Sequence, residues 1–432
     1  KRLLGFLLTV FALSMQIRAN HYQITYYMLM LMLVIFVFYG IKAIREKSLK
    51  SFSKSLILLI SSGILSLGLN APPLLATSEY MHFSTRGKSE LTLNPDGSLK
   101  ESTGGLSRDY ITQFSYGIFE SLNLIIPRIQ GGGSTEDLGE NSDLFEFLVQ
   151  NGVPQSQSKS FVSNVPTYWG SQPILEAPAY VGITVVFLAT IALFLVRGPL
   201  RNSLFAGIIL SLLLSWGKNL PWLTNFFIDY FPLYNKFRAV SSIQIILEFC
   251  FPILACLGIH QVFIKSKKNN LKNILKISGG FISLLIILLL SKGLIDFSGS
   301  MDEYIREGYG PVLMGKILEA RKQIYNYDLI RAIIYCLLIS VLYFLFYGAK
   351  IGKIKAIIIL TVIVLIDLIG ISNRYIDREM FVSPRQIKSL FQPRSGDLAI
   401  LKDDSRFRVF EPALQLSGSR TSYFHNAIGG YH

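Results

Sequence analysis

The sequence predicts an all-α polytopic membrane protein with about nine transmembrane helices and large loops on one side of the membrane. Of its 432 residues, 51% are hydrophobic and only 16% are charged, whereas a soluble domain averages about 25% charged residues. Apolar runs of about 20 residues recur along the chain, and each could cross a hydrocarbon core about 30 Å thick. Together, these observations favour a membrane fold over a soluble one.

The apolar runs define nine predicted spans, of which the first and fifth are short. They are Leu3–Ile17, Gln23–Ile41, Ser55–Leu75, Pro178–Val196, Asn202–Trp216, Ala239–Ile264, Ile274–Ile295, Asp328–Tyr347 and Ile354–Ser372. The predicted parts are three spans in 1–75, a large loop in 76–177, six spans in 178–372 and a soluble domain beginning in 373–432. In that last part "RFRVFEP" predicts a strand, and hence a β-containing domain. Because the chain begins with "KRLLGF" and ends in "GGYH", we expect it to be truncated at both ends.

Basic residues predict the orientation. Lysines and arginines number five in "KAIREKSLKSFSK", two in "RGPLR", five in "KSKKNNLKNILK" and three in "KIGKIK", and these connections alternate along the chain. Cytoplasmic loops carry such an excess, so in a bacterial inner membrane the N-terminus would be cytoplasmic and the C-terminus periplasmic. The loop 76–177, with twelve acidic and six basic residues, would lie outside.

The same charge pattern excludes some functions. The net charge of +14 comes from short basic connections, which are topology signals, so we expect no nucleic-acid partner. Cys250, Cys256 and Cys336 all lie in apolar runs without a Cys-x-x-Cys pair. We therefore expect neither a disulfide framework nor a zinc site.

Three outer stretches predict helices lying in the membrane interface. They are "FSYGIFESLNLIIPR" at 114–128, "PWLTNFFIDYF" at 221–231 and "PVLMGKILEARKQIYNY" at 311–327. Each alone is explained by aromatic residues anchored at the interface. Together they suggest the floor of a cavity at the membrane surface.

The sixth span carries unexpected polar residues. At about 100° per residue, Ser241, Gln244 and Glu248 fall on one helical face below Arg238. Glu248 would lie about 15 Å deeper than Arg238, near the bilayer midplane. Such a carboxylate is either functional or a neutral group hydrogen-bonded to a neighbouring helix. Lys236 and Arg238 at the outer end could bind a lipid phosphate or simply extend towards the interface.

Other polar residues gave weaker signals. "STRGKSEL", which contains Arg86, lacks the spacing of a nucleotide-binding loop but could contact phosphate. Tyr168 and Trp169 in "PTYWGSQP" could stack on a sugar ring or form a packed aromatic corner. Asp367 could pair with Arg374, seven residues further on. No metal cluster is evident in the sequence.

Six stretches in order resemble one known family. They are "ANHYQITYYMLM", "STRGKSELT", "SYGIFESLNLIIP…GGGS", "YWGSQP…APAYVG", "FPLYNKFRAVSSI" and "SRTSYFHNAIGGYH". This pattern is similar to the YfhO-like bacterial membrane proteins of the Bacteroidota type, over nearly the whole chain. The resemblance implies a GT-C-like glycosyltransferase architecture, with Glu79, Glu90 and Glu120 at family-like positions of the large loop.

The resemblance implies transfer of a sugar from a polyprenyl-phosphate donor to an envelope acceptor, without another cofactor. The donor phosphate would lie against Lys236 and Arg238, with Arg86 or Arg128 contributing from the large loop. GT-C-like enzymes carry a catalytic acidic residue, which acts as the general base, in their first outer loop. The first outer turn here, "RANHY", has none, so the catalytic residue stays unknown. The alternatives are a transporter or flippase of a lipid-linked substrate, or a non-catalytic scaffold with envelope protein partners.

Overall fold

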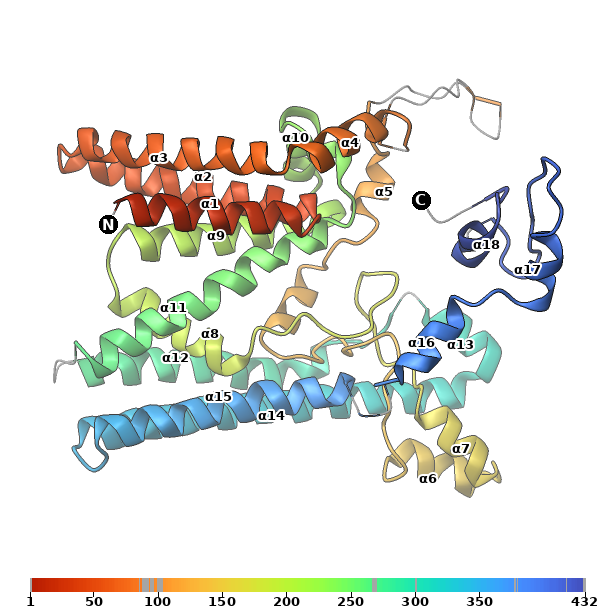
Figure 1. Ribbon diagram of the computed structural model, residues 1–432. Coiled ribbons are helices and arrows are strands. Elements are labelled where there is room, and N and C mark those ends of the chain that lie inside the picture. The colour runs from red at the N-terminus through yellow and green to blue at the C-terminus, as the bar shows by residue number, and fades with distance from the viewer. Residues whose placement is uncertain are drawn as a thin grey trace. The chain divides into compact units, whose positions relative to one another are not determined.

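The protein is represented by a computed structural model that describes all residues except 1, 85, 88–92, 94–96, 99–103, 266–269, 300, 377, 379, 417 and 430–432. The chain divides into two compact units, Lys1–Ser372 and Asn373–His432, whose helices are drawn in Figure 1. Both units are helical, and the described residues form isolated β-bridges, among them Glu136–Val165 and Val409–Ala427, but no strand. An all-α architecture is thus confirmed for the described chain.

Six helical segments of the described chain are long and apolar enough to cross a membrane. They are Tyr22–Arg45, Leu49–Leu69, Val240–Phe263, Asn270–Leu294, Pro311–Tyr347 and Lys353–Tyr375. The other three predicted spans are the shorter helices α1 (Arg2–Arg18), α8 (Ile183–Leu195) and α9 (Pro199–Ser215). With 13 residues, α8 rises only about 20 Å, less than the thickness of a hydrocarbon core.

Among the first three helices, polar contacts join the third helix to the first. Helices α2 (Tyr22–Arg45) and α3 (Leu49–Leu69) follow α1 through short turns. Ser66 Oγ donates to the carbonyl of Val10 at 3.0 Å, and Asn70 Nδ2 donates to the carbonyl of Ser14 at 3.3 Å. Such side-chain hydrogen bonds link helices where apolar packing alone gives little specificity.

The third predicted span ends earlier than expected. We predicted Ser55–Leu75, but α3 ends at Leu69 and a separate helix, α4 (Ala71–His82), follows. Pro72 and Pro73 cannot donate backbone hydrogen bonds to a continuing helix, whereas they fit the first turn of a new one.

Residues 105–177 of the large loop, with 178–182 after them, pack partly into the first unit. They contain α5 (Arg108–Thr112), the 3-10 turn η1 (Phe119–Leu124), α6 (Asp143–Gln150) and α7 (Gln155–Val162). The predicted interfacial helix at 114–128 is wrong, because the stretch forms only η1 and turns, with Glu120, Asn123 and Leu124 buried. Its buried carboxylate organises the loop locally, as described below.

Helix α8 lies at the centre of the first unit. Nine of its thirteen residues are buried, and it packs against α11 (Ile245–Phe263), α12 (Asn270–Leu290) and α14 (Pro311–Tyr347). A helix that is apolar all round is expected to be enclosed by neighbours. The core of buried apolar residues runs through these helices and α9.

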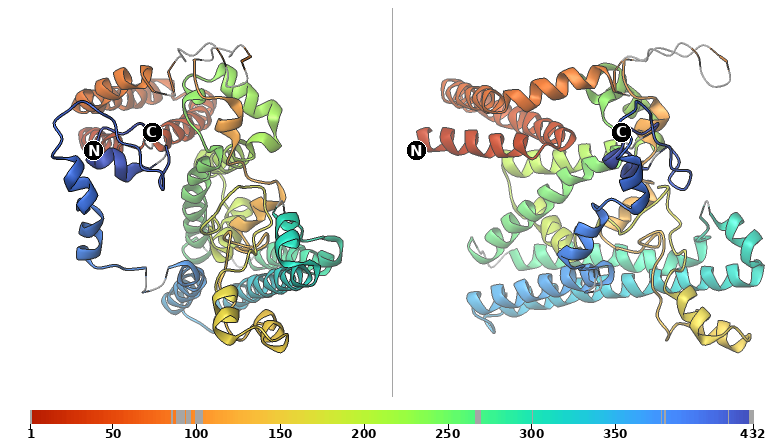
Figure 2. Two further views of the ribbon diagram at one scale, coloured as in Figure 1. Left: turned by 90° about the vertical axis from the view of Figure 1, so that its right-hand side faces the viewer. Right: turned by 45° about the vertical axis from the view of Figure 1, so that its right-hand side comes forward.

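The other two predicted interfacial helices have different outcomes. The stretch at 221–231 is a separate helix, α10 (Pro221–Tyr230), which begins at the proline as expected. The stretch at 311–327 instead forms the start of α14, whose 37 residues rise about 55 Å. Helix α13 (Asp302–Tyr309) packs against α14, as can be followed in Figure 2. A further span-length helix, α15 (Lys353–Tyr375), comes next.

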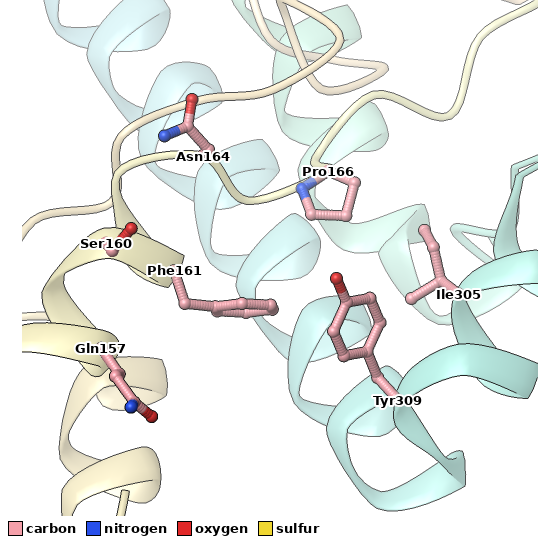
Figure 3. Close-up of a pocket in the computed structure, with 7 residues that line it drawn as sticks. All are labelled: Gln157, Ser160, Phe161, Asn164, Pro166, Ile305 and Tyr309. Carbon is pink, nitrogen blue, oxygen red and sulfur yellow. The ribbon is translucent and has the colours of Figure 1, made fainter. Parts of the chain in front are cut away.

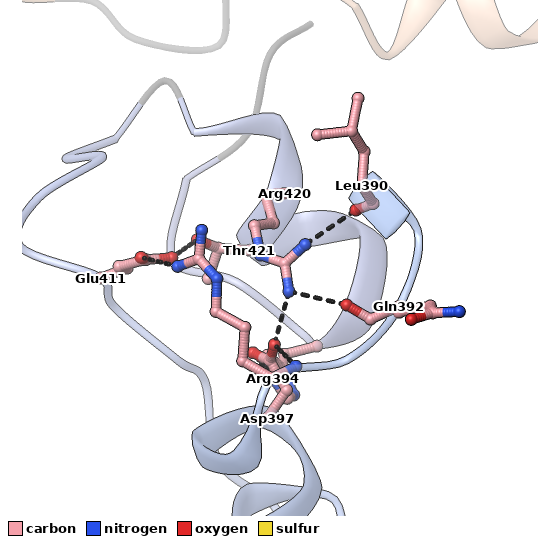
Figure 4. A network of polar contacts seen from close by, with 8 residues as sticks. Leu390, Gln392, Arg394, Asp397, Glu411, Arg420 and Thr421 are labelled. Carbon is pink, nitrogen blue, oxygen red and sulfur yellow. Dashed lines mark hydrogen bonds and ion pairs between the residues drawn. The ribbon is translucent and has the colours of Figure 1, made fainter. Parts of the chain in front are cut away.

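The second unit contains three short helices, α16 (Pro384–Leu390), α17 (Ser395–Ile400) and α18 (Ser419–Phe424). The strand predicted at "RFRVFEP" is wrong for the described residues, where Val409 forms one isolated bridge with Ala427. A polar network around Asp397 holds the unit together instead (Figure 4). Arg420 Nη2 donates to Asp397 Oδ2 at 2.8 Å, and His425 Nε2 lies 3.0 Å from Asp397 Oδ1. The backbone N–H of Arg394, followed by His425 and Arg420, lowers the pKa of Asp397 to about 2.

Candidate functional site

The segment that enters α11 is irregular and carries the predicted cations. Leu233 and Ala239 adopt left-handed backbone conformations, with φ of 65° and 56°. Between and after them lie the 3-10 turns η3 (Tyr234–Lys236) and η4 (Val240–Gln244), and α11 itself begins only at Ile245. The predicted single polar face from Arg238 to Glu248 is therefore wrong, because these residues do not share one α-helix.

Arg86 and Lys236 meet although they are 150 residues apart. Arg86 Nε donates to the carbonyl of Lys236 at 2.9 Å, and Lys236 Nζ donates to the carbonyl of Arg86 at 2.7 Å. Lys236 Nζ also donates to the carbonyl of Gly104. The two basic side chains thus clamp the large loop onto the segment before α11.

Arg238 is positioned by two neighbouring elements. Its guanidinium lies 5.0 Å from the ring centre of Tyr110 and donates to the Tyr110 hydroxyl. Its carbonyl accepts a hydrogen bond from Gln23 Nε2 at 2.7 Å, and Gln23 also donates to Tyr27. The start of α2 therefore fixes the backbone that presents Arg238. We call Arg86, Tyr110, Lys236 and Arg238 the mouth cluster.

Arg108 lies next to the mouth cluster in the sequence, and its charge is neutralised by an acidic partner. Its guanidinium contacts Asp229 Oδ1 and Asn225 Oδ1, each at 2.7 Å. By contrast, the side-chain hydrogen bonds of Arg86 and Lys236 to described residues go to neutral carbonyl oxygens. A cation that donates to neutral carbonyls keeps its charge available to an anion. The charges of these two side chains are thus not neutralised by an acid among the described residues.

The other residues of the predicted polar stripe lie in separate environments. Gln244 is buried and its Nε2 lies 3.4 Å from Ser215 Oγ. The backbone N–H of Ser241 donates to the carbonyl of Phe114 at 3.2 Å. Glu248 lies in the first turn of α11 and is exposed on the protein surface. Only Arg238 of this set belongs to the mouth cluster.

Glu120 is the centre of a buried hydrogen-bond network. One carboxylate oxygen accepts from the Tyr168 hydroxyl at 2.6 Å and from Gln172 Nε2 at 2.9 Å. The other accepts from the backbone N–H groups of Gly117 at 2.9 Å and Ser171 at 3.1 Å. With four donors and no exposed surface, Glu120 is a structural anchor and does not face a substrate.

The same network constrains Tyr168 and Trp169. Burial and then the adjacent Glu120 carboxylate raise the pKa of Tyr168, which keeps its phenol protonated. Trp169 packs between Phe119 and Phe297, with ring centres 6.2 and 5.1 Å away. Of the two interpretations of this dipeptide, the packed aromatic corner is the one these contacts support.

Arg128 has different partners from those predicted. Its guanidinium makes a two-pronged contact with Asp328 at 3.0 and 3.1 Å and donates to Glu136 at 3.2 Å. Two nearly buried carboxylates already face this cation, so the structure offers no support for its predicted role as a phosphate ligand. The remaining loop candidates contribute little: Glu79 is exposed on α4, and Glu90 lies outside the described residues.

Two buried ion pairs were missed by sequence reasoning. Arg321 and Asp302 are joined by two contacts of 2.7 and 2.8 Å. Asp367, which we expected to pair with Arg374, contacts Arg331 at 2.6 Å and the hydroxyl groups of Tyr180 and Thr184, each at 2.7 Å. In the sequence, the only signal was the presence of Arg331 and Asp367 within apolar runs; Asp302 and Arg321 lie in polar stretches and gave none.

A separate pocket of about 480 Å³ lies between α7 and α13 (Figure 3). The rings of Phe161 and Tyr309 lie 5.7 Å apart at its side, and Gln157, Ser160 and Asn164 supply neutral polar groups. Because no charged residue lines it, this pocket is not suited to phosphate. The mouth cluster is the better anion site. No group of acidic, histidine or cysteine side chains that could hold a metal occurs within the described parts of the chain.

Comparison with known proteins gave no relatives. No protein-family model, no curated protein and no solved structure matches this chain.

Proposed function

We propose that the chain binds a lipid-linked phosphate at the mouth cluster and transfers the attached sugar to an acceptor of the cell envelope, as a GT-C-like glycosyltransferase does. The meeting of Arg86 and Lys236 carries the proposal. This contact places Arg86 of the large loop next to Lys236, which precedes α11 and is two residues from Arg238. The sequence resemblance to the YfhO-like proteins supplies the sugar-transfer part.

The chemistry of such a transfer needs cations at the donor phosphate. The bond between the anomeric carbon and the phosphate oxygen breaks, and that oxygen keeps the electron pair. A new bond forms between the anomeric carbon and the acceptor hydroxyl oxygen, and the hydroxyl proton is taken up by the departing phosphate. Arginine and lysine near the departing phosphate stabilise its developing negative charge. Arg86 and Arg238 would supply this stabilisation at the mouth cluster.

Helix α10 supports a lipid-linked donor rather than a soluble one. Trp222, Phe226 and Tyr230 recur every four residues and are 69%, 50% and 75% exposed. Aromatic side chains of this kind favour the membrane–water interface. Asp229 of the same helix pairs with Arg108, two residues from Tyr110 of the mouth cluster. A phosphate bound there would thus lie near the headgroup level.

Binding of polyprenyl phosphate in detergent micelles tests the proposal. Arg86→Ala and Arg238→Ala should each weaken binding by about tenfold or more, because a hydrogen bond to a charged group contributes about 1.5–3 kcal/mol. Arg108→Ala is the matched control, since Asp229 and Asn225 already hold its charge. Unfolding temperatures measured alongside would separate lost binding from lost structure. Unchanged binding in Arg238→Ala would refute the assignment.

Two alternative functions give different outcomes in the same system. A transporter would move the lipid-linked substrate across reconstituted vesicles without transferring its sugar. A scaffold would keep its full cellular function in Arg238→Ala and Glu248→Gln and would co-purify with envelope proteins. Sugar transfer by the reconstituted wild-type chain that is lost in Arg238→Ala would support the enzyme.

A further inference from the structure

A groove of about 550 Å³ opens between α2 and α3, near the turn that joins them. This volume is within the range of about 300–1,000 Å³ that is usual for ligand pockets. The groove exists because the two helices pack on different partners, α2 mainly on α9 and α3 mainly on α1. It lies outside the mouth cluster and shares no residue with it.

The lining of the groove changes from apolar to polar along the helices. Met32, Ile35 and Leu59 lie at one end. The rings of Phe36 and Phe52, whose centres are 5.3 Å apart, lie between the ends. The opposite end is polar and is lined by Lys42, Glu46, Ser48 and Ser51. Lining residues recur every three or four positions, which places them on one face of each helix.

The length of the groove matches one leaflet of a bilayer. From Met32 to Glu46 the helix advances fourteen residues, or about 21 Å. Half of a hydrocarbon core is about 15 Å, which leaves about 6 Å for the start of a headgroup. An acyl chain could lie between the apolar walls while its headgroup reaches the polar end.

The turn at the polar end is strongly basic. It carries Lys42, Arg45, Lys47, Lys50 and Lys54 against the single acid Glu46. Glu46 lies 3.8 Å from Lys42, and the other four basic side chains are exposed. The charge at this end therefore complements an anionic headgroup, and a zwitterionic one would gain less.

We propose that this groove is a specific site for one anionic phospholipid. Its acyl chain lies between α2 and α3, and its phosphate contacts Lys47 and Lys50 at the turn. The site is independent of the proposed sugar transfer. It would couple the packing of the first helical hairpin to the lipid composition of the leaflet on that side.

Native mass spectrometry of the full chain in detergent tests this site, with phosphatidylglycerol and phosphatidylcholine as probes. The wild type should retain one phosphatidylglycerol in preference to phosphatidylcholine. Lys47→Gln combined with Lys50→Gln should weaken retention of phosphatidylglycerol by about 25-fold, at about fivefold for each lysine near an anionic surface. Ser55→Trp, which fills the groove at a lining position, should prevent retention without changing the charge.

A matched control variant and a comparison of the two phospholipids make the result decisive. Lys272→Gln combined with Lys276→Gln removes two charges from another basic connection and should leave retention unchanged. If that variant loses the lipid as readily as the Lys47 and Lys50 variant, the attraction is a general charge effect and the site is refuted. Equal retention of the two phospholipids by the wild type would also refute it.

Discussion

At Glu120, four donors converge on one buried carboxylate. Charge-assisted hydrogen bonds of this kind are stronger than those between neutral groups. Both acceptor oxygens belong to Glu120, whereas the donors belong to residues 117, 168, 171 and 172. A single side chain therefore joins the η1 turn to the "YWGSQP" segment. This explains how two irregular segments of the large loop are held together around a buried charge.

Glu120→Gln should therefore destabilise the protein although the shapes of the two side chains are nearly the same. The amide keeps one acceptor oxygen and places an NH₂ group against the remaining donors. Leaving buried donors unpaired costs about 1–3 kcal/mol each, so we expect a loss of about 3 kcal/mol and a lower unfolding temperature in detergent. Glu79→Gln, at an exposed position, should leave the unfolding temperature unchanged. An equally stable Glu120→Gln protein would show that the network is not needed for folding.

At the scale of elements, the segment before α11 decides how the mouth cluster is presented. If Val240–Gln244 were α-helical, Arg238 would continue the helical face of Gln244 and Glu248. The left-handed backbone at Ala239 instead turns Arg238 towards Tyr110 and Gln23. An L-residue other than glycine is strained by about 1–2 kcal/mol in this conformation, so the surrounding hydrogen bonds must hold it there.

Substitutions at Ala239 should reveal this strain. Ala239→Gly should keep or slightly raise the unfolding temperature, because glycine adopts positive φ without a steric penalty. Ala239→Val should lower stability by more than about 1 kcal/mol, since a β-branched residue is rarely tolerated there. The same substitutions at Ala332, in the regular helix α14, should not show this order, because glycine is unfavourable inside a helix. A more stable Ala239→Val protein would contradict the left-handed assignment.

The sequence was informative where its signal was local. Apolar runs located all six span-length helices, and Pro221 marked the start of α10. Lys236 and Arg238 were singled out by charge at a span end and Arg86 by charge in the large loop, and the structure joins Arg86 to Lys236. The partners of Arg128 and Asp367 could not be predicted, because Asp328 is 200 positions and Arg331 36 positions away. Helical periodicity also failed at Val240–Gln244, where a 3-10 turn that follows the left-handed Ala239 replaces the α-helix.

At the scale of the whole molecule, α14 sets how far the first unit reaches beyond a membrane. A span needs about 20 residues, so about 17 of its 37 residues must lie beyond the hydrocarbon core. They pack against α13 and α6 and include Arg321, which is buried against Asp302. A charged pair of this kind is better accommodated in a folded part outside the bilayer than against lipid. The outer loops and the first half of α14 would thus form one body on the membrane surface.

Cysteine labelling of intact and permeabilised cells tests this arrangement together with the predicted orientation. In a Cys256→Ala background, which removes the exposed cysteine and leaves two buried ones, Glu319→Cys on α14 should react with a membrane-impermeant maleimide from outside the cell. Lys47→Cys, in the basic turn between α2 and α3, should react only after permeabilisation, because basic connections stay in the cytoplasm. Ile334→Cys, within the predicted span, should stay unlabelled in both conditions. Labelling of positions 319 and 47 from the same side would contradict the arrangement, since it would place the first half of α14 and the basic turn on one face of the membrane.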